Sequence, residues 1–134
     1  MSDVKQALAM LHMAEKDLNA LLGMEDNPLF AEEIFGFHAQ QAAEKSLKAW
    51  LCVRGLAYPP THDLSRLLTL LENSGADVAA YWPLDQYTLF AVQARYELGV
   101  MEHENPLNRR AVIEEIRALF RHVAAQMDSI NSEP

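Results

Sequence analysis

Residues 37–51 read FHAQQAAEKSLKAWL, a stretch that contains neither glycine nor proline. Most of its residue types favour the α-helix. The helix is expected to run from about Phe30 to Arg54. Gly55 is a natural C-terminal cap, and Pro59-Pro60 then prevents the helix from continuing.

Apolar residues recur at three- and four-residue steps on both sides of this stretch, as in amphipathic helices. They predict four more helices, over about residues 4–22, 63–73, 83–98 and 106–130. Ser2 or Asp3 and Thr61 or Asp63 are candidate N-caps, while Pro83 and Pro106 suit a first helical turn. The expected inner faces are Val4, Leu8, Leu11, Leu18 and Leu22; Leu64, Leu67, Leu68 and Leu71; Leu84, Tyr87, Ala91, Ala94 and Leu98; and Ile113, Ile116, Leu119, Phe120, Val123, Met127 and Ile130.

No segment shows the alternation that is typical of a strand, and helices joined by short loops indicate an antiparallel bundle. We therefore expect one all-α domain over residues 1–134, an antiparallel up-down bundle of about five helices with a short disordered C-terminal tail. A fold class of this kind does not by itself define a function.

The charge and composition of the chain argue against several classes of binding site. The formal net charge of −8 opposes non-specific binding to nucleic acid, so any such site must be a local pocket. The single cysteine, Cys52, excludes an internal disulfide and a multi-cysteine zinc site. Without an apolar stretch of membrane length or a signal-peptide pattern, we expect a cytoplasmic protein. No glycine-rich phosphate loop and no E-x-x-H pair occur, so neither a cofactor nor a metal site is expected.

Helix 30–54 carries a row of polar side chains that share one face by their spacing of three and four residues: His38, Gln41, Lys45 and Lys48. Hydrogen-bonding and cationic groups around an imidazole could hold phosphate oxygens. The alternative is a solvated stripe in which Glu44 pairs with Lys48 at the favourable four-residue spacing. Both interpretations stay open.

The order of these residues resembles the HEPN family. Its prokaryotic members carry a similar H-x-Q-Q-A-A-E-K-x-L-K-A helix, and here His38 to Ala49 is followed by Thr61-His62-Asp63-Leu64 and, later, by Ala94-Arg95-Tyr96. The resemblance covers about residues 37–96. It implies a helical bundle that commonly forms a homodimer and pairs with a minimal nucleotidyltransferase, often as a toxin–antitoxin-like module. It also implies a nucleotide or RNA ligand in a cleft near the dimer interface.

Many relatives are metal-independent ribonucleases that use an Arg, four to six intervening residues and then a His. Arg95 corresponds to that Arg, where it could stabilise transition-state charge, and His103 is the following His, which could act as a general acid or base. Seven residues separate the two, however, and Asn105 replaces a Tyr that some relatives carry. Arg117 and His122 fit the spacing literally, but residues five apart on a helix point in different directions.

His62 comes just before a predicted helix, where it could present a donor to an anion near the positive helix end. Alternatively, Thr61-His62-Asp63 only caps that helix. The residues expected to bind the ligand are therefore His38, Gln41, Lys45, Lys48, His62 and Tyr96. Three hypotheses remain: a nucleotide- or RNA-binding module that acts with a nucleotidyltransferase, a ribonuclease that uses Arg95 and His103, and a purely structural interaction bundle.

Overall fold

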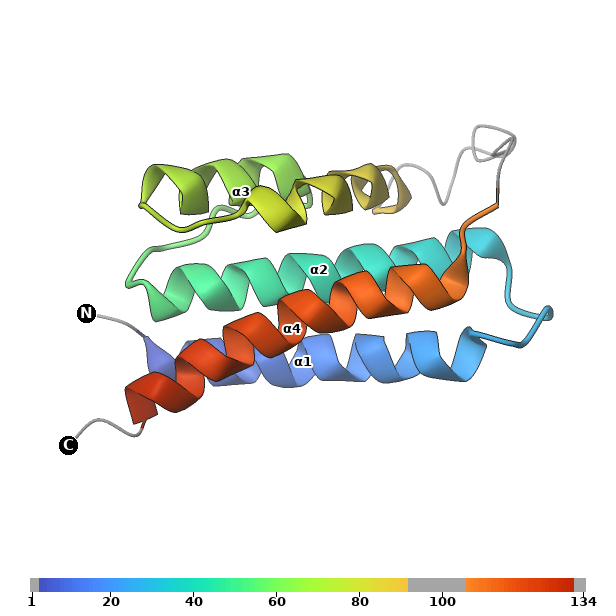
Figure 1. Ribbon diagram of the computed structural model, residues 1–134, viewed down its shortest axis with the longest axis horizontal. Coiled ribbons are helices and arrows are strands. Elements are labelled where there is room, and N and C mark those ends of the chain that lie inside the picture. Colours follow the sequence, from blue (N-terminus) through green and yellow to red (C-terminus); the bar gives the residue numbers. More distant parts are fainter. Residues whose placement is uncertain (1–2, 92–105, 132–134) are drawn as a thin grey trace.

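The computed structural model describes residues 3–91 and 106–131, of which the last two by their backbone only. Five helical elements follow one another in this part of the chain, and it contains no strand. They are α1 (Val4–Met24), α2 (Glu32–Val53), α3 (Leu64–Asn73), the 3₁₀ helix η1 (Ala79–Phe90) and α4 (Arg109–Asn131). The predicted all-α helical bundle is confirmed (Figure 1).

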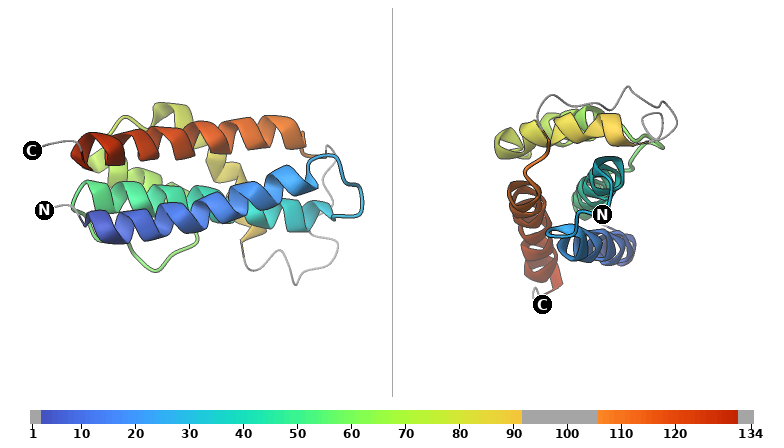
Figure 2. Two further views of the ribbon diagram at one scale, coloured as in Figure 1. Left: turned by 90° about the horizontal axis from the view of Figure 1, so that it is seen from below. Right: turned by 90° about the vertical axis from the view of Figure 1, so that its right-hand side faces the viewer.

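Helix α2 lies at the centre and contacts each of the other four elements. Helices α1 and α4 lie on one side of it, and α3 and η1 form a layer on the other side (Figures 1 and 2). Strict up-down alternation does not hold throughout: α3 runs in the same direction as α2 (Figure 1). Accordingly, Arg54 at the end of α2 donates to Ser74 at the end of α3. No helix among the described residues is long and apolar enough to cross a membrane.

The buried face of α1 is rotated by one position from the predicted face. Leu11 and Leu18 are buried as expected, whereas Leu8 and Leu22 are 48% and 42% exposed. Their neighbours line the core instead: Ala7, Ala14 and Leu21. Ala7 of α1 and Ala39, Ala42 and Ala43 of α2 belong to the same buried core, and small side chains allow two helices to approach each other closely.

The predicted C-cap at Gly55 is confirmed, and Gly75 has the same role after α3. Gly55 (φ 76°) follows α2, and the Leu56 amide donates to the Leu51 carbonyl at 2.9 Å. Gly75 (φ 99°) ends α3 in the same way. A positive φ is the backbone region that glycine tolerates best, which is why the chain turns at these positions.

The predicted fourth helix is wrong in type and start. An α-helix was expected to begin at Pro83, but the chain forms a 3₁₀ helix from Ala79, with Pro83 inside it. Proline has no amide proton and disfavours an α-helical interior. Leu84, Tyr87 and Ala91 are buried as predicted, whereas Ala94 and Leu98 lie outside the described residues. Phe90 packs against Gly36 so closely that a Cβ there would lie 2.3 Å from the ring, and glycine is therefore required.

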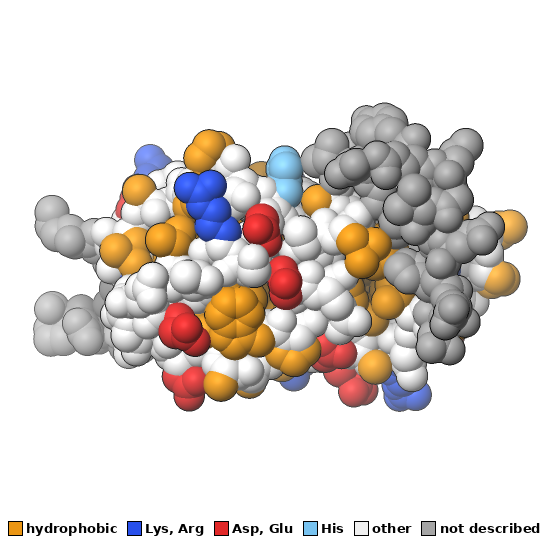
Figure 3. Space-filling view, turned by 90° about the horizontal axis from the view of Figure 1, so that it is seen from above, with side chains coloured by type: hydrophobic (Ala, Val, Ile, Leu, Met, Phe, Trp, Pro, Cys, Tyr) orange, Lys and Arg blue, Asp and Glu red, His pale blue; other side chains and the backbone are white. Residues whose placement is uncertain are grey.

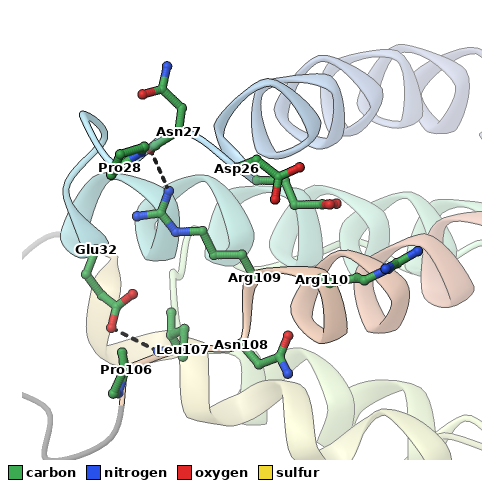
Figure 4. A pocket seen from close by; sticks show the side chains of 10 residues that line it. Asp26, Asn27, Pro28, Glu32, Pro106, Leu107, Asn108, Arg109 and Arg110 are labelled. Carbon is green, nitrogen blue, oxygen red and sulfur yellow. Dashed lines mark hydrogen bonds between the residues drawn. The ribbon is translucent and has the colours of Figure 1, made fainter.

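Helix α4 begins at Arg109, slightly later than predicted, with Asn108 as the residue that accepts from the Ala111 amide. Its predicted apolar stripe is buried except for Phe120, which is half-buried, and Ile130, whose side chain lies outside the description. Arg109 holds the start of the helix against the loop between α1 and α2, with Asn27 among its contacts (Figure 4). Nearby, Glu32 accepts from the Leu107 amide at 2.9 Å (Figure 4).

Candidate functional site

The polar row of α2 does not act as one face. His38 and Lys45 turn toward α1, where both contact the carboxylate of Asp17. The His38 Nδ1 lies 2.9 Å from Asp17 Oδ1, and the Lys45 Nζ lies 2.6 Å from Asp17 Oδ2. The Asp17 side chain is 11% exposed, so this cluster connects α1 to α2 through a largely buried carboxylate.

A second carboxylate, that of Glu44, is the centre of another cluster of hydrogen bonds. Lys48 donates to its Oε2 at 2.8 Å, and the His62 Nδ1 lies 2.9 Å from its Oε1. Gln40 donates to Glu44 and to the backbone carbonyl of His62, and Gln41 donates to the Gln40 carbonyl oxygen. This second cluster therefore connects α2 to the segment that precedes α3.

The solvated-stripe interpretation is wrong for Lys48. The side chains of Glu44 and Lys48 are only 6% and 9% exposed, and the Lys48 ammonium also lies 5.2 Å from the centre of the Tyr58 ring. The predicted pair at four-residue spacing does exist, but it is a buried ion pair. Such a pair is costly to break, because either partner alone would leave an uncompensated buried charge.

Burial and hydrogen bonding act in opposite directions on the two carboxylates. Burial raises the pKa of Asp17, but hydrogen bonds from His38 and Lys45 outweigh it, so that the pKa lies below its ordinary value. Burial likewise raises the pKa of Glu44, and hydrogen bonds from Lys48, Gln40 and His62 lower it further than burial raises it. Both groups are therefore held as carboxylates at neutral pH.

These lowered pKa values predict acid sensitivity. A carboxylate with a lowered pKa stabilises the fold above its unfolded pKa, and this stability is lost as the pH falls through the folded pKa. We expect the free energy of unfolding, from urea titrations, to fall below about pH 4.5, the ordinary value for Glu. Glu115 acts in the opposite direction, because burial raises its pKa. In Asp17→Asn the acid-induced loss should be smaller, and an unchanged loss would contradict the assignment.

His62 differs from the rest of the two clusters in being accessible. Its side chain is 55% exposed while its Nδ1 is held by the buried Glu44. The capping of α3 does not need it: Asp63 accepts from the Ser65 amide, and Thr61 accepts from the Asp63 amide. Because Nδ1 faces the carboxylate, Nε2 is the ring nitrogen left for a ligand.

A family model for the HEPN domain matches residues 5–125. The chain belongs to the HEPN domain family. Comparisons with curated proteins and with solved structures gave no match. Membership associates this HEPN chain with nucleotide- or RNA-related functions, in a family whose members often dimerise.

The residues expected to form a HEPN ribonuclease centre, Arg95 and His103, lie outside the described residues, as does Tyr96. The literal match at Arg117 and His122 lies on α4, and the His122 ring packs 4.9 Å from the Trp50 ring. Within the described ranges, no group of three or more His, Cys, Asp or Glu side chains could hold a metal ion.

Two residues of these clusters, Asp17 and Gln40, were not predicted from the sequence. Both left a signal. Asp17 lies three residues after Ala14 and four before Leu21, which places a carboxylate within the buried stripe of α1. Gln40 lies four residues before Glu44 on α2. A buried polar residue in an otherwise apolar stripe requires a partner, so each of these residues should have indicated a contact across the core.

Proposed function

We propose that this HEPN chain is a binding module that holds a nucleotide or an RNA end. It acts as a homodimer with a minimal nucleotidyltransferase, in a toxin–antitoxin-like pair. The single observation that carries the proposal is the HEPN match over residues 5–125. The geometry around His62 supports a phosphate contact there, because a protonated imidazole donates from Nε2 to an anion while Glu44 orients the ring.

The lysines contribute less directly. Lys45 is paired with Asp17, and Lys48 is paired with Glu44, so a phosphate would have to compete with carboxylates for them. We therefore assign the direct phosphate contact to His62, with Gln41 joined to the same cluster through Gln40, whereas His38 faces Asp17 on the α1 side. In this proposal Lys45 and Lys48 compensate the charge of the carboxylates that orient the two imidazoles.

Surface charge favours a local contact over a long electrostatic track. On the face formed by α3 and η1, acidic and hydrophobic side chains are interspersed and basic ones are few in the part that is described (Figure 3). A nucleic-acid backbone is held mainly by basic side chains. A single nucleotide or an RNA end therefore suits the HEPN chain better than a long duplex.

Binding to 5′-phosphorylated single-stranded RNA and to AMP, followed by fluorescence anisotropy at low salt, tests the proposal. We expect His62→Ala to weaken binding by about tenfold to a hundredfold, the effect of one charge-assisted hydrogen bond. His12→Ala is the matched control, because His12 is an exposed histidine on α1. Equal affinities of the His62 and His12 variants would remove His62 from the site.

Two further results would decide between the functions. RNA cleavage in EDTA that is lost in an Arg95→Ala/His103→Ala variant would replace the binding module by the ribonuclease. A tagged chain should also retain a minimal nucleotidyltransferase co-expressed from a neighbouring gene. The absence of both ligand binding and partner retention would leave the structural interaction bundle.

A further inference from the structure

A cleft of about 490 Å³ opens at the other side of α2, between α2, η1 and α4. Its walls include five side chains: Trp50 of α2, Arg54 at the C-cap of α2, Tyr81 of η1, and His122 and Gln126 of α4. Asp77, two residues before η1, also lines the cleft. Cavities of this size, lined by rings and a few polar groups, are typical of small-ligand sites.

Three rings from three different elements meet in this cleft. The Trp50 and His122 ring centres are 4.9 Å apart, the Trp50 and Tyr81 centres 5.8 Å, and the Tyr81 and His122 centres 5.6 Å. Trp50 is buried, Tyr81 is half-buried and His122 is exposed. The Tyr81 and His122 rings therefore form a partly exposed aromatic surface that packs on the buried Trp50 indole.

The rim carries hydrogen-bonding groups of both kinds. Ser74 fixes Arg54 by accepting from its Nε at 2.7 Å and from its Nη2 at 2.5 Å, and the outer Nη1 has no partner among the described residues. The Gln126 amide has no hydrogen bond within the described part of the chain, and Asp77 uses only Oδ1, to accept from the Ala79 amide. The rim thus offers guanidinium and amide donors beside amide and carboxylate acceptors.

We propose that this cleft binds a single nucleobase, supplied by a free nucleotide or by single-stranded RNA. A nucleobase is planar, so it stacks on aromatic rings, and its edge carries both donors and acceptors that match the rim. The inference rests on the proposed function for its ligand class but concerns a second site. Lys48 and Trp50 are two positions apart on α2 and point about 200° apart, so the cleft and the Glu44–His62 contact lie on different sides of the helix.

Tryptophan fluorescence tests the inference on the full chain. Trp82→Phe removes the other tryptophan, so that the emission reports Trp50 alone. We expect AMP and UMP to change this emission and ribose 5-phosphate to leave it unchanged. His122→Ala should weaken AMP binding by about fivefold to a hundredfold, the range for loss of one stacking ring. Arg121→Ala, an exposed neighbour on α4, is the matched control and should bind like the parent.

A single-stranded oligouridylate and an abasic oligonucleotide of the same length distinguish the sources of the base. A response to the oligouridylate that is much stronger than the response to UMP assigns the cleft to RNA, and equal responses assign it to free nucleotides. An equal response to ribose 5-phosphate or to the abasic strand, or unaltered AMP binding in both His122→Ala and Gln126→Ala, would overturn the nucleobase site. If His62→Ala weakens AMP binding while these cleft variants do not, only this inference fails. Absence of any binding defeats both proposals.

Discussion

Glu44→Gln is expected to lower the free energy of unfolding by about 3–5 kcal/mol, the cost of leaving one charge of a buried pair unpaired. The Glu44 side chain is 6% exposed and accepts from Lys48, Gln40 and His62. The amide has the same shape, but it removes the charge that compensates the buried Lys48 ammonium. Urea unfolding at neutral pH, followed by the helical circular dichroism signal, measures the loss.

Glu15→Gln is the matched control, since Glu15 is an exposed glutamate on α1, and it should change stability by no more than about 0.5 kcal/mol. The double variant Glu44→Gln/Lys48→Met removes both charges and should recover much of the lost stability. A Glu44 variant as stable as the Glu15 variant would show that Lys48 does not depend on Glu44.

Arg109→Ala is expected to lower the free energy of unfolding by about 1.5–3 kcal/mol, the contribution of a hydrogen bond to a charged group. The guanidinium donates to the carbonyls of Met24, Asn27 and Phe30, at 2.7, 3.1 and 2.6 Å. It also lies 5.1 Å from the centre of the Phe35 ring. The loss is not larger because the Phe30 carbonyl is exposed and can form a hydrogen bond to water in the variant. Urea unfolding measures it.

Arg110 is the natural comparison, because it is the next residue and it is exposed, with a side chain that points away from Arg109 and Glu32 (Figure 4). Arg110→Ala should leave stability nearly unchanged. Arg109→Lys keeps the charge but cannot reach three carbonyls with the same geometry, so its stability should fall between those of the parent and the alanine variant. Equal stability of the two alanine variants would mean that the loop is held by other contacts.

The sequence allowed the central helix and its ends to be predicted well, because local signals decide them. Gly55 and Gly75 lie where a positive φ is needed, and no residue between Glu32 and Val53 disfavours a helix strongly apart from Gly36. The inner face of α1 was harder to predict. Leucine spacing favoured Leu8 and Leu22, but the buried positions are Ala7 and Leu21, one residue earlier in each case.

The division of the polar row could not be predicted from spacing alone. His38 and Lys45 share a face with Lys48 in the sequence pattern, yet the carboxylate that takes the first two comes from α1, 21 residues before His38. Similarly, His62 reaches Glu44 only because the segment after Pro59-Pro60 runs back along α2. These contacts depend on how helices are arranged in space, which local periodicity does not define.

The Asp17 cluster has a consequence for how α1 and α2 align along their axes. A shift of one helical turn, about 5.4 Å, would keep the same face of α1 turned toward α2. Such a shift would carry the Asp17 carboxylate away from His38 and Lys45 and leave a largely buried carboxylate and two partly buried partners unpaired. A salt bridge of this kind therefore specifies the register of the helix pair, and it discriminates against neighbouring alignments more than it adds to the total stability.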